Sequence, residues 1–190
     1  MELLQAIKER RSIRKFKPDP VPESMLDGII KNALWAPSGM NTQPWKFMVL
    51  TGRKQQEFLG VTDRAISHLD KRLKELFNDK MRTFIHGYFK DLGGAPAIIV
   101  ALTAVHDQDV YMSTSYQSSA AAFYNLMLLA HEAGLGTCWM TGQLWVEEDI
   151  LAFLEHKNAW RLVGVTPIGY PDQVPPVPPR KHENIEWLSD

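Results

Sequence analysis

The chain has 190 residues, 45% of them hydrophobic, and its 21 basic and 22 acidic side chains give a formal net charge of −1. This length fits one domain, at about 100–200 residues per domain, and the apolar content is enough for one sizeable core. The balanced charge argues against the broad basic surface that nucleic-acid binding needs.

Cysteine content and hydropathy indicate the cellular compartment in which the protein is expected. Cys138 is the single cysteine, so no internal disulfide can form, and no Cys/His spacing suggests a metal site. The N-terminal residues lack the long apolar stretch of a signal peptide. The longest apolar run, residues 95–105, is too short to span a membrane. We therefore expect a cytoplasmic protein without a metal and without a membrane partner.

Two helices are expected before the first strand. Residues 1–9 carry three large apolar side chains on one helical face, and residues 22–36 repeat this pattern. Pro22 suits a first helical turn and Pro37 stops the helix. The apolar run WKFMVL, residues 45–50, then predicts a short buried strand.

Between these two helices lies the basic stretch RRSIRKFK, residues 10–17. Such a run fits a solvated face, a nucleic-acid patch or a site for a small phosphorylated ligand. The nucleic-acid interpretation is the weakest of the three, because the basic excess does not continue elsewhere. A phosphate needs only two or three guanidinium groups at one spot.

The second half of the chain predicts strands around one long helix. Residues 53–90 are charged and largely helical, and we expect a partly exposed helical cap rather than core. Strands are expected at residues 96–104, 137–142 and 160–171. The long helix before Gly134 is apolar on most of its circumference, which is typical of a core or a subunit interface.

The C-terminal residues, 171–190, are rich in proline up to Pro179, so that part is neither helix nor central strand. We expect this extension to pack on a second subunit. The alternating helices and strands predict a single layered α/β or α+β domain over residues 1–190. Neither GxxxxGK[ST] nor GxGxxG after a strand is present. Side chains would therefore have to hold any nucleotide.

Three separated motifs resemble those of the nitroreductase family of flavin enzymes: RRSIRKF, APSGMNTQPWKFMVL and GLGTCWMTG. The late PPRK is also similar, and the resemblance covers nearly the whole chain, although residues 53–90 carry no family motif. It implies an α+β nitroreductase-like fold, with a central, mainly antiparallel sheet flanked by helices. It also implies an intertwined homodimer with FMN at the subunit interface. The implied activity is an FMN-dependent oxidoreductase that takes hydride from NADH or NADPH by a ping-pong mechanism. Its acceptors would be nitroaromatics, quinones or related small molecules.

The resemblance gives the basic run a role at the flavin. Arg10 and Arg11 take the positions of the family's phosphate and ribityl ligands, where a guanidinium fork matches the phosphate oxygens. Ser12 adds a hydrogen bond in the same region. Arg14 takes the position of the cation near N1 and O2 of the ring, where a fixed positive charge favours the reduced flavin.

The second motif is similar to the segment that reaches the flavin of the other subunit. Ser38, Gly39 and Asn41 would supply short polar contacts around the ring and its dimethylbenzene side. Gln43 would either contact the flavin or brace Arg10 or Arg14, and these two roles stay open.

The third motif and the tail complete the implied cofactor site. Trp139 and Met140 would form an apolar wall against the ring, and Thr141 and Gly142 would donate backbone amides, with the Thr141 amide near N5. The flavin carries the hydride, so no catalytic side chain is assigned. Cys138 is interpreted as a buried core thiol. A late basic residue would close on the phosphate, either Arg180 or Lys181.

The reaction itself stays open at this stage. Related enzymes with this scaffold carry out dehalogenation or dehydrogenation of a small substrate, and a non-catalytic FMN-binding protein is a further alternative. The deiodinase lid has a tyrosine three or four residues after a glutamate, and Glu75 has none at that spacing. Phe77, Phe84 and Tyr88 are candidates to line an acceptor pocket.

Overall fold

The computed structural model describes residues 2–180 and 185–188. In this part of the chain, strands β1 (Trp45–Thr51), β2 (Ala97–Ala104), β4 (Trp160–Gly169) and β3 (Gly136–Thr137) form one antiparallel sheet, in that order across it. The predicted α+β class and the antiparallel sheet are confirmed, and β1, β2 and β4 match the predicted strands closely.

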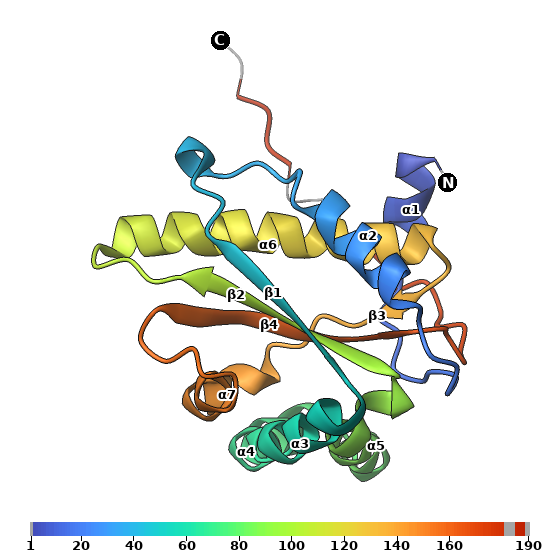
Figure 1. The fold of residues 1–190 in the computed structure, drawn as a ribbon. Helices are drawn as coiled ribbons and strands as arrows, with labels where there is room; N and C mark the ends of the chain where they lie inside the picture. The colour runs from blue at the N-terminus through green and yellow to red at the C-terminus, as the bar shows by residue number, and fades with distance from the viewer. Residues whose placement is uncertain (1, 181–184, 189–190) are drawn as a thin grey trace.

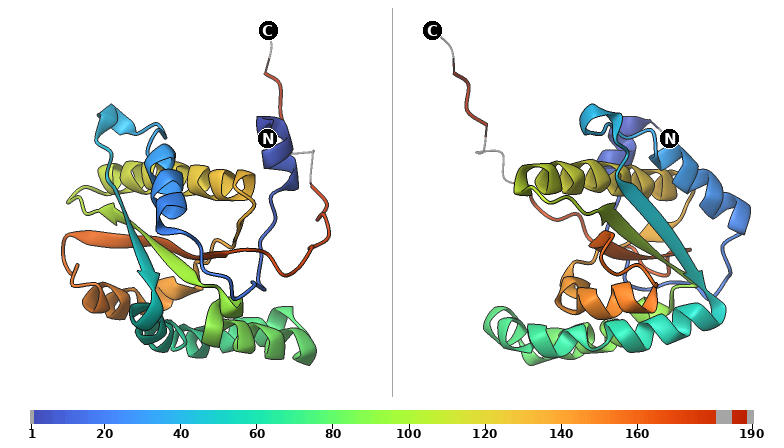
Figure 2. Two further views of the ribbon diagram at one scale, coloured as in Figure 1. Left: turned by 45° about the vertical axis from the view of Figure 1, so that its right-hand side comes forward. Right: turned by 60° about the vertical axis from the view of Figure 1, so that its left-hand side comes forward.

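Helices cover both faces of this sheet (Figure 1). One layer holds α2 (Glu23–Ala33) and α6 (Asp109–Glu132), with α1 (Leu3–Glu9) against the C-terminal end of α6. The opposite layer holds α3 (Gly52–Thr62), α4 (Ala65–Leu76), α5 (Asp79–Asp91) and α7 (Glu147–Phe153), and the two turned views in Figure 2 keep these layers on opposite sides. Short 3-10 turns lie at Gly39–Asn41, Leu92–Gly94 and Gly142–Val146. Among the described residues, none of the helices combines the length and apolarity needed to cross a membrane.

The central strand β2 shows how the sequence divides the core. All its residues except the last are buried, and successive side chains point to opposite faces. Ile98, Val100 and Leu102 pack with the layer of α3, α5 and α7. Ala97 and Ile99 pack with α2 and α6 instead. A strand buried on both sides must be apolar at every position, which explains the uninterrupted run AIIVAL.

The predicted cap, residues 53–90, is helical but is not excluded from the core. Phe58 of α3 is completely buried, and Tyr88 and Phe89 of α5 are buried beside it in the main hydrophobic cluster. Only part of the segment has the predicted exposure, for example Leu76 and Phe84. The correction has a simple reason: α3 is amphipathic, and its few apolar residues all face the sheet.

The third predicted strand, residues 137–142, is much shorter than expected. Its ladder with β4 covers only Gly136–Thr137, because the Cys138 amide donates to the Thr166 side-chain hydroxyl at 3.0 Å instead of to a strand carbonyl. Pairing resumes once, where Met140 exchanges backbone hydrogen bonds of 2.8 and 3.0 Å with Val165. The segment is therefore free to bend away from the sheet after Met140.

The start of the tail is held by its own chain. Pro171 bridges Phe16, the Asp172 amide donates to the Lys15 carbonyl at 2.9 Å, and the Lys15 ammonium pairs with the Asp172 carboxylate at 2.5 Å. The Lys15 ammonium holds the pKa of Asp172 below its usual value. Further along, Ile185, Trp187 and Leu188 are exposed on this chain.

Candidate functional site

Two segments that carry the basic run and the third motif lie side by side. Ser12 and Thr137 form a parallel bridge, and the Ile13 amide donates to the Thr137 carbonyl at 2.9 Å. A Cβ on Gly136 would come within 2.7 Å of the Ile13 side chain, so glycine is required for this close approach. Because the two segments run parallel at this bridge, Arg14 and residues 138–142 continue in the same direction and line a common pocket.

A first hollow lies at the N-terminal end of these paired segments, and we call it the Arg10 pocket. It encloses about 400 Å³ between the end of α1, the end of α6 and the start of the tail. The Nε and Nη1 atoms of Arg10 are buried there without a hydrogen-bond partner among the described residues. A donor that is buried without a partner is unfavourable by roughly 1–3 kcal/mol unless an anion or polar group joins it. The pocket is therefore suited to an anionic ligand.

Arg11 is positioned differently from its neighbour. Its Nη1 atom donates to the carbonyls of Lys8 at 2.6 Å and of Arg10 at 2.8 Å. These carbonyls belong to the end of α1, where a cationic side chain satisfies otherwise unpaired acceptors. Arg11 borders the Arg10 pocket, but its guanidinium is already used as a helix cap.

The second hollow, which we call the Arg14 pocket, has a volume of about 370 Å³. The paired segments supply Arg14 and the predicted residues from Trp139 to Gly142, while α4, α5 and Trp145 close it from the other side. A Cβ on Gly142 would meet Phe89 at 2.8 Å and Leu69 at 2.9 Å. We call α4 and α5, which carry Leu69 and Phe89, the lid helices. A side chain larger than glycine at residue 142 would force them to shift.

Within the Arg14 pocket, the predicted apolar wall is built in part from other residues. Trp139 borders the pocket, but its indole packs edge-on against Phe123 of α6, with ring centroids 4.6 Å apart. Phe84 and Tyr88 of α5 stack with their centroids 6.3 Å apart and form the facing wall. Among the described residues, the buried Tyr88 hydroxyl has no hydrogen-bond partner. Burial, together with the neighbouring Cys138 thiol, raises the pKa of Tyr88 far above its ordinary value.

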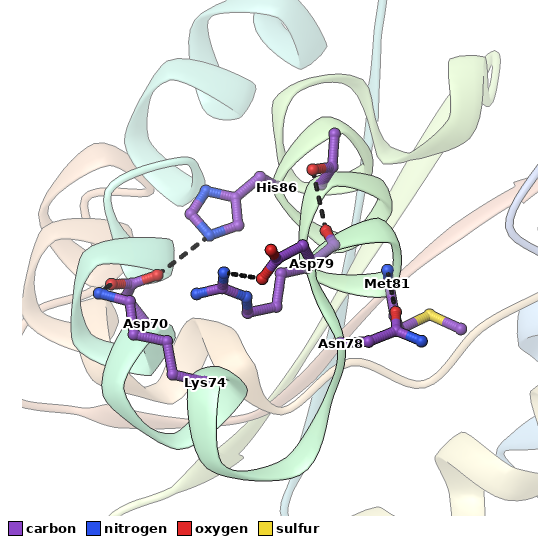
Figure 3. A network of polar contacts seen from close by, with 8 residues as sticks. Asp70, Lys74, Asn78, Asp79, Met81 and His86 are labelled. Atoms are coloured by element: carbon purple, nitrogen blue, oxygen red, sulfur yellow. Dashed lines mark hydrogen bonds and ion pairs between the residues drawn. The ribbon is translucent and has the colours of Figure 1, made fainter.

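The lid helices α4 and α5 are tied to each other and to the pocket rim. Asp70 of α4 accepts from Lys74 at 2.5 Å on the same helix and from His86 of α5 at 3.3 Å (Figure 3). The hydrogen bond from Lys74 lowers the pKa of Asp70. His68 of α4 stacks on Trp145, with ring centroids 5.7 Å apart. These contacts join the lid to the segment that follows Gly142.

The loop that holds Ser38, Gly39, Asn41 and Gln43 lies apart from both pockets. The Gly39 amide donates to the Ser118 hydroxyl at 3.3 Å, at the N-terminal half of α6. His131, which borders the Arg10 pocket, lies more than three turns further along α6, roughly 20 Å away at 1.5 Å per residue. Within one chain, therefore, this loop and Arg10 are not brought together.

The loop from Ser38 to Gln43 nevertheless has a specific backbone conformation with hydrogen bonds of its own. Met40, Asn41 and Gln43 have φ angles of 51°, 55° and 47°, which is unfavourable for residues with a Cβ. The Gln43 amide donates to the Ser38 hydroxyl at 3.1 Å, and the Gln43 side chain donates to Asn41 at 3.2 Å. Gln43 does not brace Arg10 or Arg14 of its own chain.

Arg180 of the tail is not among the residues that line either pocket. Arg180 is exposed, and its Nη1 atom lies 3.4 and 3.3 Å from the carbonyls of Pro178 and Pro179. Lys181 lies outside the described residues. The pocket residues that sequence reasoning did not assign include His131 and Thr137. Neither stands in a recognisable motif of titratable residues, so only the tertiary structure, which places α6 and β3 beside the basic run, reveals them.

Comparison with known proteins supports the motifs that carried the resemblance. The model of the Nitroreductase family matches residues 7–170. The chain is 27% identical to "Putative NAD(P)H nitroreductase YfhC" of Bacillus subtilis, covering 94% of this chain and 89% of that protein. It is 29% identical to 4-nitrobenzoate reductase of Pseudomonas putida, covering 88% and 84%.

A solved structure of oxidised iodotyrosine deiodinase, bound to FMN and 3-iodo-L-tyrosine, superposes with a TM-score of 0.77 and 25% identity over the full length of both chains. The fold, the matched residues and the relatives agree with one another. The chain belongs to the nitroreductase family.

Proposed function

We propose that this protein is an FMN-dependent NAD(P)H oxidoreductase that reduces nitroaromatic, quinone or related small acceptors. The observation that carries the proposal is the pair of Arg10 guanidinium nitrogens, Nε and Nη1, which are buried without a hydrogen-bond partner among the described residues. They lie at the end of two parallel segments that lead to Arg14 and Thr141. The names of two relatives, an NAD(P)H nitroreductase and 4-nitrobenzoate reductase, support this choice of donor and acceptor.

The residues present fit FMN. The Arg10 pocket would take the phosphate, because orphaned guanidinium donors are matched by a dianion. Thr137 lines the Arg10 pocket, and Ser12 is bridged to it. Both residues would contact the ribityl chain. The Arg14 pocket would take the ring. From residue 10 to residue 14 an extended chain spans about 13 Å, at about 3.3 Å per residue, which separates a phosphate from a ring system.

FMN, when bound, supplies the hydride-transfer chemistry between a nicotinamide and an acceptor. The chain's own residues bind and orient. Arg14 places a positive charge beside the ring and stabilises negative charge there. Strand pairing ends at Met140, so the backbone near Thr141 would be available to the ring. Phe84, Tyr88 and Trp145 line the pocket and would contact the acceptor.

The proposal includes a homodimer in which each flavin is held by both chains. Its support is the distance between the Ser38–Gln43 loop and the Arg10 pocket in one chain. Large apolar side chains left exposed on this chain are candidates for the interface: Leu3, Leu4, Ile7, Trp35, Met40, Ile185, Trp187 and Leu188. The protein would work in the cytoplasm, where NADH and NADPH are available.

The experiment that tests this function is an anaerobic titration of the purified protein with NADH and with NADPH. The protein should carry about one FMN per chain, and one of the two nucleotides should bleach it. Reoxidation by 4-nitrobenzoate or a quinone should follow with ping-pong kinetics. Bound FMN that neither nucleotide reduces would indicate a flavin-binding protein without this activity, and preferential turnover of 3-iodotyrosine would indicate dehalogenation instead.

A further inference from the structure

His131 is a second unpartnered group in the Arg10 pocket. It lies in the last turn of α6, and its Nε2 atom is buried without a hydrogen-bond partner among the described residues. The same pocket contains the orphaned Nε and Nη1 atoms of Arg10. Two side chains from distant parts of the sequence thus leave hydrogen-bonding nitrogens buried at one hollow of about 400 Å³.

The charges around His131 define what this hollow can accept. Glu9 at the end of α1, with Arg10 and Arg11 that follow it, are the charged groups that line the pocket from the facing segments, and the lining residues of β3 and the tail are uncharged. On α6 itself, Glu132 is the neighbouring charged residue. The Glu9 carboxylate accepts from Gln5 at 3.1 Å. Two guanidinium groups against one carboxylate leave the pocket with an excess of positive charge.

Burial lowers the pKa of His131, Glu9 partly offsets this, and Arg10 and Arg11 lower the pKa further. The imidazole is therefore neutral near pH 7 in the protein without a ligand. A dianion placed between Arg10 and His131 would reverse the balance, because a nearby negative charge favours the protonated ring. Uncharged tail residues form one side of the hollow: Pro171, Gln173, Val174, Pro175 and Val177.

We propose that His131 binds a phosphate monoester dianion together with Arg10, and that this phosphate belongs to the flavin cofactor. The inference rests on the proposed function, since it assigns FMN to this chain. It adds a phosphate ligand outside the basic run and makes cofactor binding dependent on pH. A phosphate ester on the nicotinamide substrate has the same chemistry, so the test includes NADPH and NADH.

The test compares FMN with riboflavin, which lacks the phosphate. Apoprotein of the wild type and of His131→Ala, His131→Gln and His156→Ala would be titrated with both flavins by fluorescence quenching. His156 contacts Lys46 on the other side of the sheet and serves as the control histidine. We expect His131→Ala to reduce the preference for FMN over riboflavin about tenfold at pH 6.5, the equivalent of one charge-assisted hydrogen bond. His156→Ala should leave the preference unchanged.

The dependence on pH distinguishes a phosphate ligand from a structural histidine. In the wild type, the FMN preference should increase as the pH falls from 8.5 to 6.5, because the bound state takes up a proton. The His131→Gln variant keeps a hydrogen-bond donor that does not titrate in this pH range. Its preference for FMN over riboflavin should therefore lack the part of the pH dependence that arises from His131. The protonation of the phosphate itself, with a pKa of about 6, affects all variants equally and cancels in the comparison.

The outcomes separate this inference from the proposed function. Tight FMN binding with the same preference and pH dependence in His131→Ala as in the wild type would overturn the role of His131 and leave the flavoprotein assignment intact. A change in the NADPH to NADH ratio with an unchanged FMN preference would overturn the assignment to the flavin. Binding of neither flavin by folded wild-type protein would overturn the proposed function itself.

Discussion

Adjacent residues in one motif can have unrelated roles, and Arg10 and Arg11 illustrate this. Both are arginines at the end of α1, and the family resemblance assigned them together to the phosphate and ribityl chain of the flavin. In the structure, Arg10 keeps two nitrogens buried and unpartnered, whereas Arg11 is bonded to carbonyls of α1. The difference arises because neighbouring residues in an extended segment point in opposite directions.

This difference gives a paired prediction. Arg10→Ala should weaken FMN binding by about 1.5–3 kcal/mol, because a charge-assisted contact to the phosphate is lost. Arg11→Ala should leave FMN affinity within about threefold of the wild type and lower stability by a few tenths of a kcal/mol through the lost helix cap (order of magnitude). Isothermal titration with FMN and urea unfolding would measure both effects. Equal losses of affinity in the two variants would contradict the separate roles.

At the level of elements, the lid helices depend on one close backbone approach. Gly142 lies where α4 and α5 press against the segment after Met140, and its missing Cβ is what allows the contact with Phe89 and Leu69. The contact between His86 and Asp70 in Figure 3 joins α5 to α4, but it lies away from Gly142. Packing at Gly142 therefore determines how tightly the lid closes over the Arg14 pocket.

Gly142→Ala should destabilise the protein by about 1–3 kcal/mol, because the added methyl group overpacks the contact with the lid. Gly60→Ala is the matched control: Gly60 lies in α3 with open space where the Cβ would be. That substitution should stabilise the protein by about 0.5–1 kcal/mol through helix propensity. Equilibrium unfolding in urea would measure both, and a neutral Gly142→Ala would show that the lid yields easily.

For the whole molecule, the separation of the two halves of the proposed site is the main consequence of the fold. The long α6 places the Ser38–Gln43 loop near one end and the Arg10 pocket near the other. Its buried face packs on the sheet, while Tyr124 on the other side is 37% exposed. In the proposed homodimer, a second subunit that packs against the exposed side of α6 would place the Ser38–Gln43 loop of one chain near the Arg10 pocket of the other.

A mixing experiment tests the shared site. Asn41→Asp should disturb the partner's flavin, and Arg10→Ala should disable the phosphate contact of its own chain. In a heterodimer of these two inactive variants, both lesions fall on one site and the other site is intact. Co-refolding should therefore restore up to about half of the wild-type activity per heterodimer. The proposed subunit interface should bury on the order of 2,000 Å² or more. Proven heterodimers without activity, or a stable monomer that retains FMN in sedimentation, would contradict it.

The sequence by itself determined the elements whose signals are local. The apolar runs of β1, β2 and β4 predicted buried strands, and the small apolar residues of α6 predicted a buried helix. The spacing of the three motifs was enough to identify the family. These features could be predicted because each depends on consecutive residues whose propensity and periodicity agree with the final fold.

The tertiary structure alone decided which side chains meet. His131 joins Arg10, Tyr88 joins Cys138, and Trp139 turns toward Phe123 through contacts between elements remote in sequence. The early end of the third strand has the same origin, because a hydroxyl of Thr166 on the adjacent strand takes the Cys138 amide. Periodicity fixes which face of an element is apolar. The positions of the neighbouring elements fix which partner each polar group finds, and therefore which nitrogens remain free to bind a ligand.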